Sequence, residues 1–198
     1  MRKNFVLEIK IIIIGIIGIS LLSEYHLENL FHKKKIYILL EKLLAIVYIG
    51  LVLSITVCRK ESFTTPQRIL VPFQSYLMLA KVPWHGFGMY VAMAILGNLV
   101  LFIPLGILVD KAMDRRRHKV WIAIGLGFFC SLMIEAYQYV SLVGTFEVDD
   151  LIQNTWGAWI GCCLQNIVDE WYEKKKLSWE NILPITLFIM IFGMCCVI

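Results

Sequence analysis

Side chains that can carry charge or form several hydrogen bonds gather in a short stretch of an otherwise apolar chain. Foremost among them are Glu135, Gln138, Asp149, Asp150 and Asn154. A carboxylate near the centre of a membrane helix costs about 2.5–3.5 kcal/mol on insertion scales, so it usually faces a partner or a wet cavity. A carboxylate beside an amide could hold a polar head group or a cationic peptide, and a buried glutamic acid could act as general acid or base. This stretch is therefore the candidate functional site.

The same residues also have structural interpretations. Glu135 and Gln138 could form a buried pair that fixes helix register, with Asn98 as a further partner. Asp149 or Asp150 could cap the amino end of a helix. The sequence contains no G-x-S-x-G elbow, H-E-x-x-H helix or glycine-rich phosphate loop. A binding protein is therefore favoured over an enzyme.

Neither a metal site nor a cofactor is predicted. Glu135, Glu147 and the two aspartates supply the oxygen ligands that divalent cations prefer, but without a defined loop spacing. None of the six cysteines lies in a C-x-x-C arrangement or near a histidine, which argues against a zinc site. The net charge of +4 comes from lysines and arginines at the ends of apolar segments. Membrane lipids are therefore the expected partners, and nucleic acid is not.

The elements that must position these residues are helices of membrane length. The chain has 198 residues, of which 59% are hydrophobic, and a mean hydropathy of +0.74. Since a span needs roughly 20 mostly apolar residues, the sequence predicts an all-α, multi-pass bundle of five to six transmembrane helices in the cell membrane. The candidate spans are Phe5–Leu22, Ile36–Val57, Gly86–Val109, Val120–Val143, Leu151–Val168 and Ile182–Ile198. If Phe5–Leu22 lies in the membrane interface instead, five remain.

The positions of the basic residues predict the orientation of the bundle. Lysines and arginines collect at Lys33–Lys35, Lys111–Lys119 and Lys174–Lys176, which lie on one side of a six-span arrangement. Clusters of this kind mark the cytoplasmic side. The connections Cys58–His85 and Gly144–Asp150 are then extracytoplasmic.

Helical spacing brings the candidate residues together. Ser131, Glu135 and Gln138 are three or four positions apart and share one helix face. The short turn Gly144–Val148 makes the two flanking helices antiparallel neighbours, so their polar ends should face each other. The expected result is a shared pocket open to the outside.

Three further patterns bear on packing. Pro104 interrupts a predicted span, so the carbonyl of Val100 should need a partner from a neighbouring helix. Gly157 and Gly161 are spaced to let another backbone approach closely. Beyond Pro72, apolar residues including Phe73, Tyr76, Leu77 and Ala80 recur at helical spacing and predict a short interfacial helix on the outer face.

Three blocks of sequence together resemble the VanZ family of small bacterial membrane proteins. They are the basic-apolar-Pro-Phe segment Arg68–Phe73, the Asn-apolar-Phe-Ile-Pro-apolar-Gly span Asn98–Gly106, and the Glu-x-x-Gln and Asp-apolar-apolar-x-Asn-Thr signature that runs from Glu135 to Gly157. The core of the resemblance covers residues 68–161, within a predicted VanZ-like domain at 36–198. Residues 1–35 form an additional hydrophobic segment and basic loop. Many members carry an arginine where this chain reads Thr145–Glu147.

The resemblance implies a protein of the cell envelope, of the kind that lowers susceptibility to teicoplanin in Gram-positive bacteria. Its expected partners are a lipid-linked wall precursor or an envelope protein, bound in the extracytoplasmic pocket. An intramembrane enzyme that modifies a lipid or peptidoglycan precursor and a small transporter remain as alternatives; in the enzyme, Glu135 would be catalytic. The candidate ligand-binding residues are Glu135, Gln138, Asp149, Asp150, Asn154, Asn98 and Arg68.

Overall fold

The long apolar runs of the sequence form helices in the computed structural model, which describes residues 15, 34–56, 63–83, 86–113, 118–173 and 175–197. The long helices are α2 (Lys34–Thr56), α4 (Phe87–Ala112), α5 (Lys119–Val140), α6 (Val148–Tyr172) and α7 (Trp179–Val197). Their bounds match the five predicted spans from Ile36 onward to within a few residues, and the all-α prediction is confirmed. The predicted span Phe5–Leu22 lies outside the described residues, apart from Gly15.

The apolar character of the long helices is uneven. Within the described part of the chain, α4, α5 and α7 are long and apolar enough to cross a membrane by length and composition. Helix α6 is as long as these but carries acids and amides on the faces that pack against its neighbours. The protein is therefore a membrane protein with at least one polar helix inside the bundle, and the number of crossings stays a prediction.

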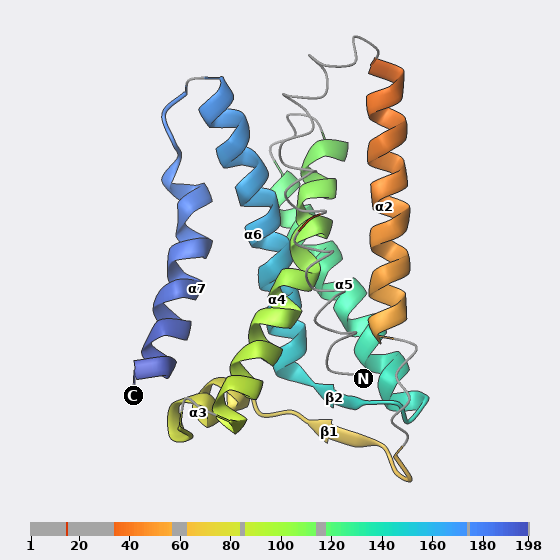
Figure 1. Cartoon of the computed structure of the whole chain (residues 1–198), viewed down its shortest axis with the longest axis vertical. Helices are drawn as coiled ribbons and strands as arrows, with labels where there is room; N and C mark the ends of the chain where they lie inside the picture. Colours follow the sequence, from red (N-terminus) through yellow and green to blue (C-terminus); the bar gives the residue numbers. More distant parts are fainter. Residues whose placement is uncertain are drawn as a thin grey trace.

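Shorter elements close one end of the bundle. Strand β1 (Gln67–Ile69) and strand β2 (Thr145–Glu147) form a parallel pair, and helix α3 (Gln74–Lys81) follows β1. In Figure 1 these elements lie together at the foot of the bundle, near the end of α7. We call residues 63–83 and 141–147 the cap.

The basic clusters gather at the opposite end. Figure 1 places the beginning of α2, the end of α4 and the turn from α6 to α7 at the end away from the cap. The first lysines of α2, Lys111 at the end of α4, and Lys175 and Lys176 in the turn belong to these segments, and Lys119 begins α5. We call this the basic end, and its single-sided arrangement agrees with the predicted orientation.

The core forms where α4 crosses α6. One stripe of α4 contributes Val91, Ile95, Leu99, Ile103 and Ile107, spaced four residues apart, to a buried cluster shared with α3, α6 and α7. The crossing is close because the helices meet at glycines. A Cβ atom on Gly157 would overlap the carbonyl oxygen of Leu99, and one on Gly161 would overlap that of Ile103. The predicted close approach at these glycines is confirmed, and the partner is α4.

Helix α2 is tied to α4 by a buried hydrogen bond near Pro104. The hydroxyl of Tyr48 donates a hydrogen bond of 2.9 Å to the carbonyl oxygen of Leu101, three residues before Pro104. The carbonyl that Pro104 deprives of its N–H donor is that of Val100, so the expected partner for Val100 stays a prediction, and the bond to Leu101 is an additional tie between α2 and α4. Tyr48 is buried, so this bond lies inside the bundle.

Removing the Tyr48 hydroxyl should loosen α2. We expect Tyr48→Phe to lower the stability of the bundle by about 0.5–1.5 kcal/mol, because one buried hydrogen bond between α2 and α4 is lost. Thermal unfolding in detergent measures the change. Tyr90→Phe is the control, since that ring is 66% exposed, and an equal effect of both substitutions would contradict the role of the hydrogen bond.

Candidate functional site

The candidate residues on α5 and α6 meet at the cap end of the bundle. Ser131, Glu135 and Gln138 are buried on one face of α5, as predicted. Asp149 and Asn154 are buried on α6, which packs against that face. We call this polar contact the seam. It comprises residues from Ser131 to Gln138 on α5 and from Asp149 to Thr155 on α6. The sequence thus predicted correctly which elements carry these residues and that they would be neighbours.

Asp149 fastens the cap to α6. One carboxylate oxygen accepts a hydrogen bond from the backbone N–H of Phe73 at 2.6 Å, and the other accepts one from the N–H of Ser75, also at 2.6 Å. These amides belong to the first turn of α3, whose own N-cap residue, Phe73, offers no side-chain acceptor. Asp149 therefore caps α3 from a distance of 74 positions in the sequence.

Glu135 and Gln138 make further ties to backbone groups. The carboxylate of Glu135 accepts a hydrogen bond of 3.0 Å from the N–H of Glu147, the residue that ends β2. The amide of Gln138 donates one of 3.2 Å to the carbonyl of Thr56, the last residue of α2. Both side chains thus hold the chain segments that surround the seam.

Deeper in the seam, some buried polar atoms have no hydrogen-bond partner among the described residues. The amide nitrogen of Asn154 donates a hydrogen bond of 2.8 Å to the hydroxyl of Ser131. The Oδ1 atom of Asn154 and the Oγ1 atom of Thr155 are buried and have no hydrogen bond among the described residues. Buried polar atoms are nearly always satisfied, so each of these exceptions marks a place where a ligand group or solvent could bind. Tyr76 and Gln165 carry two further such atoms.

The other three candidate ligand-binding residues lie outside the group formed by Ser131, Asn154 and Thr155. Asp150 is partly exposed in the first turn of α6. The side-chain amide of Asn98 on α4 donates a hydrogen bond of 3.1 Å to the side-chain oxygen Oε1 of Gln153, a buried residue of α6. Arg68 is exposed in the middle of β1, opposite Phe146 of β2. The structure therefore joins Asn98 to α6 rather than to Glu135 or Gln138, and keeps Arg68 on the surface of the cap.

The sequence did not predict three residues of the site that bind the acidic side chains through their backbone. Phe73, Ser75 and Glu147 take part through their N–H groups, which every residue but proline possesses. No residue type signals such a role. Gln153 did carry a signal, because a glutamine amid buried helix positions needs a partner.

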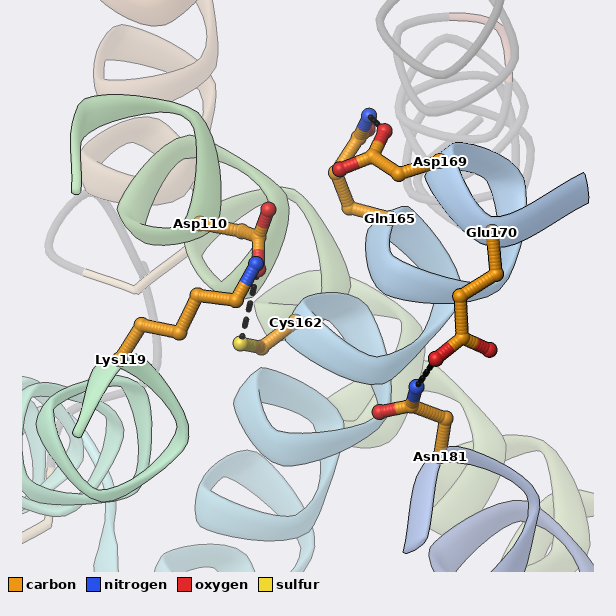
Figure 2. Close-up of polar contacts among 7 residues, drawn as sticks. All are labelled: Asp110, Lys119, Cys162, Gln165, Asp169, Glu170 and Asn181. Carbon is orange, nitrogen blue, oxygen red and sulfur yellow. Dashed lines mark hydrogen bonds and ion pairs between the residues drawn. The ribbon is translucent and has the colours of Figure 1, made fainter. Parts of the chain in front are cut away.

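A second polar cluster, which the sequence did not indicate, lies at the basic end. Asp110 of α4 is buried, pairs with Lys119 of α5 at 2.7 Å, and accepts a hydrogen bond of 3.4 Å from the thiol of Cys162 on α6. Figure 2 shows these three side chains converging, with Gln165 and Asp169 of α6 nearby. Gln165 donates a hydrogen bond of 2.9 Å to Asp169. Helices α4, α5 and α6 are thus fastened at both ends by polar contacts.

Glu170 ties α6 to the start of α7 at the same end. Its carboxylate accepts hydrogen bonds from the backbone and hydroxyl of Ser178 at 2.9 and 2.6 Å, and from Asn181 at 3.1 Å (Figure 2). Glu170 lies beyond the predicted span, which ends at Val168. Partial burial acts to raise the pKa of Glu170, but these hydrogen bonds outweigh burial and hold the pKa below its ordinary value.

This lowered pKa predicts a pH-dependent contribution to stability. A carboxyl whose pKa is lower in the folded state stabilises the fold above its unfolded pKa, near 4.3, and loses that contribution as the pH falls through the folded value. We expect Glu170→Gln to unfold at a lower temperature than the parent at pH 7, and the difference to shrink below about pH 4. Thermal unfolding between pH 7 and pH 3 measures it; a gap that stays constant would contradict the role of ionised Glu170.

The acids of the described residues do not assemble a metal centre. No group of three or more histidine, cysteine, aspartate or glutamate side chains is placed to hold a metal ion in the part of the chain that the structure describes. The acids of the seam instead have backbone N–H groups as partners, as Asp149 and Glu135 illustrate.

These features define an all-helical membrane protein with a polar seam at one end and a small cap held over it by that seam. The family model described as VanZ/LLP1 matches residues 36–169, about two thirds of the chain. The chain belongs to the VanZ family. Neither the curated proteins nor the solved structures contain a significant match to it.

Proposed function

We propose that this protein binds a polar group of an envelope lipid or a lipid-linked wall precursor in the seam, and thereby lowers susceptibility to teicoplanin-type lipoglycopeptides. The observation that carries the proposal is the pair of buried oxygens, Asn154 Oδ1 and Thr155 Oγ1, that have no hydrogen bond among the described residues. Membership of the VanZ family supports the envelope context. The protein acts as a binding protein in this proposal, and Glu135 is a ligand-binding residue.

The chemistry of the seam favours a ligand rich in hydrogen-bond donors. An amide oxygen and a hydroxyl oxygen are available at Asn154 and Thr155, and the carboxylate of Glu135 lies one helical turn from Ser131, which bonds Asn154. Acceptors and negative charge attract ammonium, amide and sugar hydroxyl groups. Wall precursors and their peptide stems carry such groups.

The orientation of the bundle supports access from outside the cell. The basic end carries the lysine clusters that mark the cytoplasmic side, so the cap and the seam belong to the extracytoplasmic side of a multi-pass arrangement in the cell membrane. Lipid-linked precursors and lipoglycopeptides meet on that side.

The test is the teicoplanin and vancomycin susceptibility of a sensitive Gram-positive host that expresses the chain. We expect the parent to protect against teicoplanin and Glu135→Gln to lose most of that protection. Losing a charge-assisted hydrogen bond weakens binding by about tenfold or more. The oxygen that remains in glutamine can still accept the hydrogen bond from Glu147, so the variant should fold.

Two comparisons make this test decisive. Glu180→Gln makes the same change of charge at an exposed residue of α7, and it should protect as the parent does at equal membrane levels. If Glu135→Gln also protects fully, the seam is not the binding site. Masses of the lipid-linked precursors should be the same with and without the protein, whereas an altered mass would mean that the protein is an enzyme.

A further inference from the structure

Helix α3 has two apolar faces, and only one is covered by the protein. Tyr76 and Leu79 are 3% and 2% exposed and pack into the main core with residues of α4 and α7. Leu77 is 55% exposed and Met78 lies beside it on the open side. The sequence predicted a short interfacial helix with a single stripe of Phe73, Tyr76, Leu77 and Ala80; Tyr76 packs into the core, whereas Phe73 and Leu77 are exposed.

The open face extends along the chain toward β1. Leu70 and Val71 are 53% and 59% exposed, and Phe73 is also exposed, so five apolar side chains lie on the surface between positions 70 and 78. We call these residues, Leu70, Val71, Phe73, Leu77 and Met78, the apolar edge of the cap. Contiguous exposed apolar residues of this kind mark an interaction surface.

The position of the cap identifies what this surface meets. Helix α3 has eight residues, too few to cross a membrane, and packs against α4 and α7, two of the helices that are apolar enough to do so. Figure 1 shows α3 at the foot of α4 and beside the end of α7. The apolar edge therefore lies at the level where the apolar helices of the bundle end.

Neighbouring residues have the character of a membrane interface. Phe87 and Tyr90, in the first turn of α4, are exposed, and their rings stack with centroids 6.4 Å apart. Arg68 and Lys81 are exposed on either side of the apolar edge. Aromatic rings and basic side chains next to apolar residues are typical of segments that lie at the level of lipid head groups.

We propose that the apolar edge of the cap is inserted into the membrane interface, with its side chains among the upper acyl carbons of the leaflet on the cap side and Arg68 and Lys81 at the head groups. The partner of this surface is the lipid bilayer itself. The cap is then an in-plane membrane element that Asp149 anchors to α6 through the first turn of α3. This inference depends on the bundle crossing the membrane and not on the proposed function.

Photolabelling in nanodiscs that hold one copy of the protein tests the proposal. Two phosphatidylcholine probes are used, with a diazirine close to the glycerol in one and at the acyl chain end in the other, and labelled peptides are mapped by mass spectrometry. We expect the peptide that carries residues 70–78 to be labelled several-fold more by the shallow probe than by the deep one. The exposed α5 segment around Phe129 and Met133 should be labelled by the deep probe too.

A variant and an internal reference make the outcome clear. Leu77→Asp should reduce labelling of residues 70–78 several-fold without lowering the unfolding temperature in detergent, because Leu77 makes no core contact. Gln67→Asp, an exposed polar position of β1, should leave labelling unchanged. A soluble protein added to the same nanodisc sample gives the background of residues outside the membrane. Labelling of residues 70–78 no higher than that background would overturn the proposal.

Discussion

Gly161→Ala should remove most of the folded protein. The added methyl group would occupy the position of the Ile103 carbonyl oxygen, which belongs to the backbone of α4 and cannot rotate away. Overpacking of a core usually costs about 1–3 kcal/mol. Because a whole helix must shift here, we expect about 3 kcal/mol or more, which is a large part of the stability of a typical domain. Thermal unfolding in detergent and the yield of monodisperse protein measure the loss.

Gly125→Ala is the matched control for this substitution. Gly125 lies within α5, and a Cβ atom built there meets nothing within 4 Å. Alanine is the better helix former by about 1 kcal/mol, so this variant should be as stable as the parent or slightly more so. If Gly125→Ala and Gly161→Ala unfold at the same temperature, α4 and α6 do not cross in the way described.

Asp149→Ala should release the cap. The substitution leaves the N–H groups of Phe73 and Ser75 without the acceptors that now lie 2.6 Å from each. A hydrogen bond to a charged group contributes about 1.5–3 kcal/mol, so we expect a loss of about 3 kcal/mol or more, concentrated in the cap. The left-handed conformation of Phe73, with φ of 60°, also favours opening of the cap once the anchor is removed, because the strain is relieved there.

Hydrogen exchange followed by mass spectrometry measures this local effect. The peptide that covers residues 67–81 should exchange much faster in Asp149→Ala than in the parent, while peptides from the middle of α4 should keep their protection. Asp149→Asn retains one acceptor oxygen and should fall between the two. Slow exchange of the cap in both variants would mean that Asp149 does not hold α3.

Much of the bundle could be predicted from local patterns. Apolar runs of membrane length gave the five long helices, and the spacing of Gly157 and Gly161 predicted a close helix contact. The parallel pairing of β1 with β2 was not predicted. Each strand has three residues, and 75 residues lie between Ile69 and Thr145, so no periodicity signals their contact.

The sequence predicted which residues form the site, but it did not predict their hydrogen-bond partners. Helical spacing placed Glu135 and Gln138 on one face and the short turn brought Asp149 near them. Their partners are backbone amides and carbonyls of the cap and of α2, and sequence type says nothing about those. The cluster around Asp110 was missed for a related reason. Its partner Lys119 was assigned to a basic loop, where charge alone explained its presence.

The polar character of α6 bears on how the protein enters the membrane. A helix with acids and amides facing its neighbours partitions poorly into lipid alone. Its neighbours α4 and α5 precede it in the chain, and they carry the groups that receive its polar side chains, such as Ser131 for Asn154 and Asn98 for Gln153. During synthesis α4 and α5 therefore emerge first, and the side chains that receive the polar groups of α6 are already made when α6 emerges.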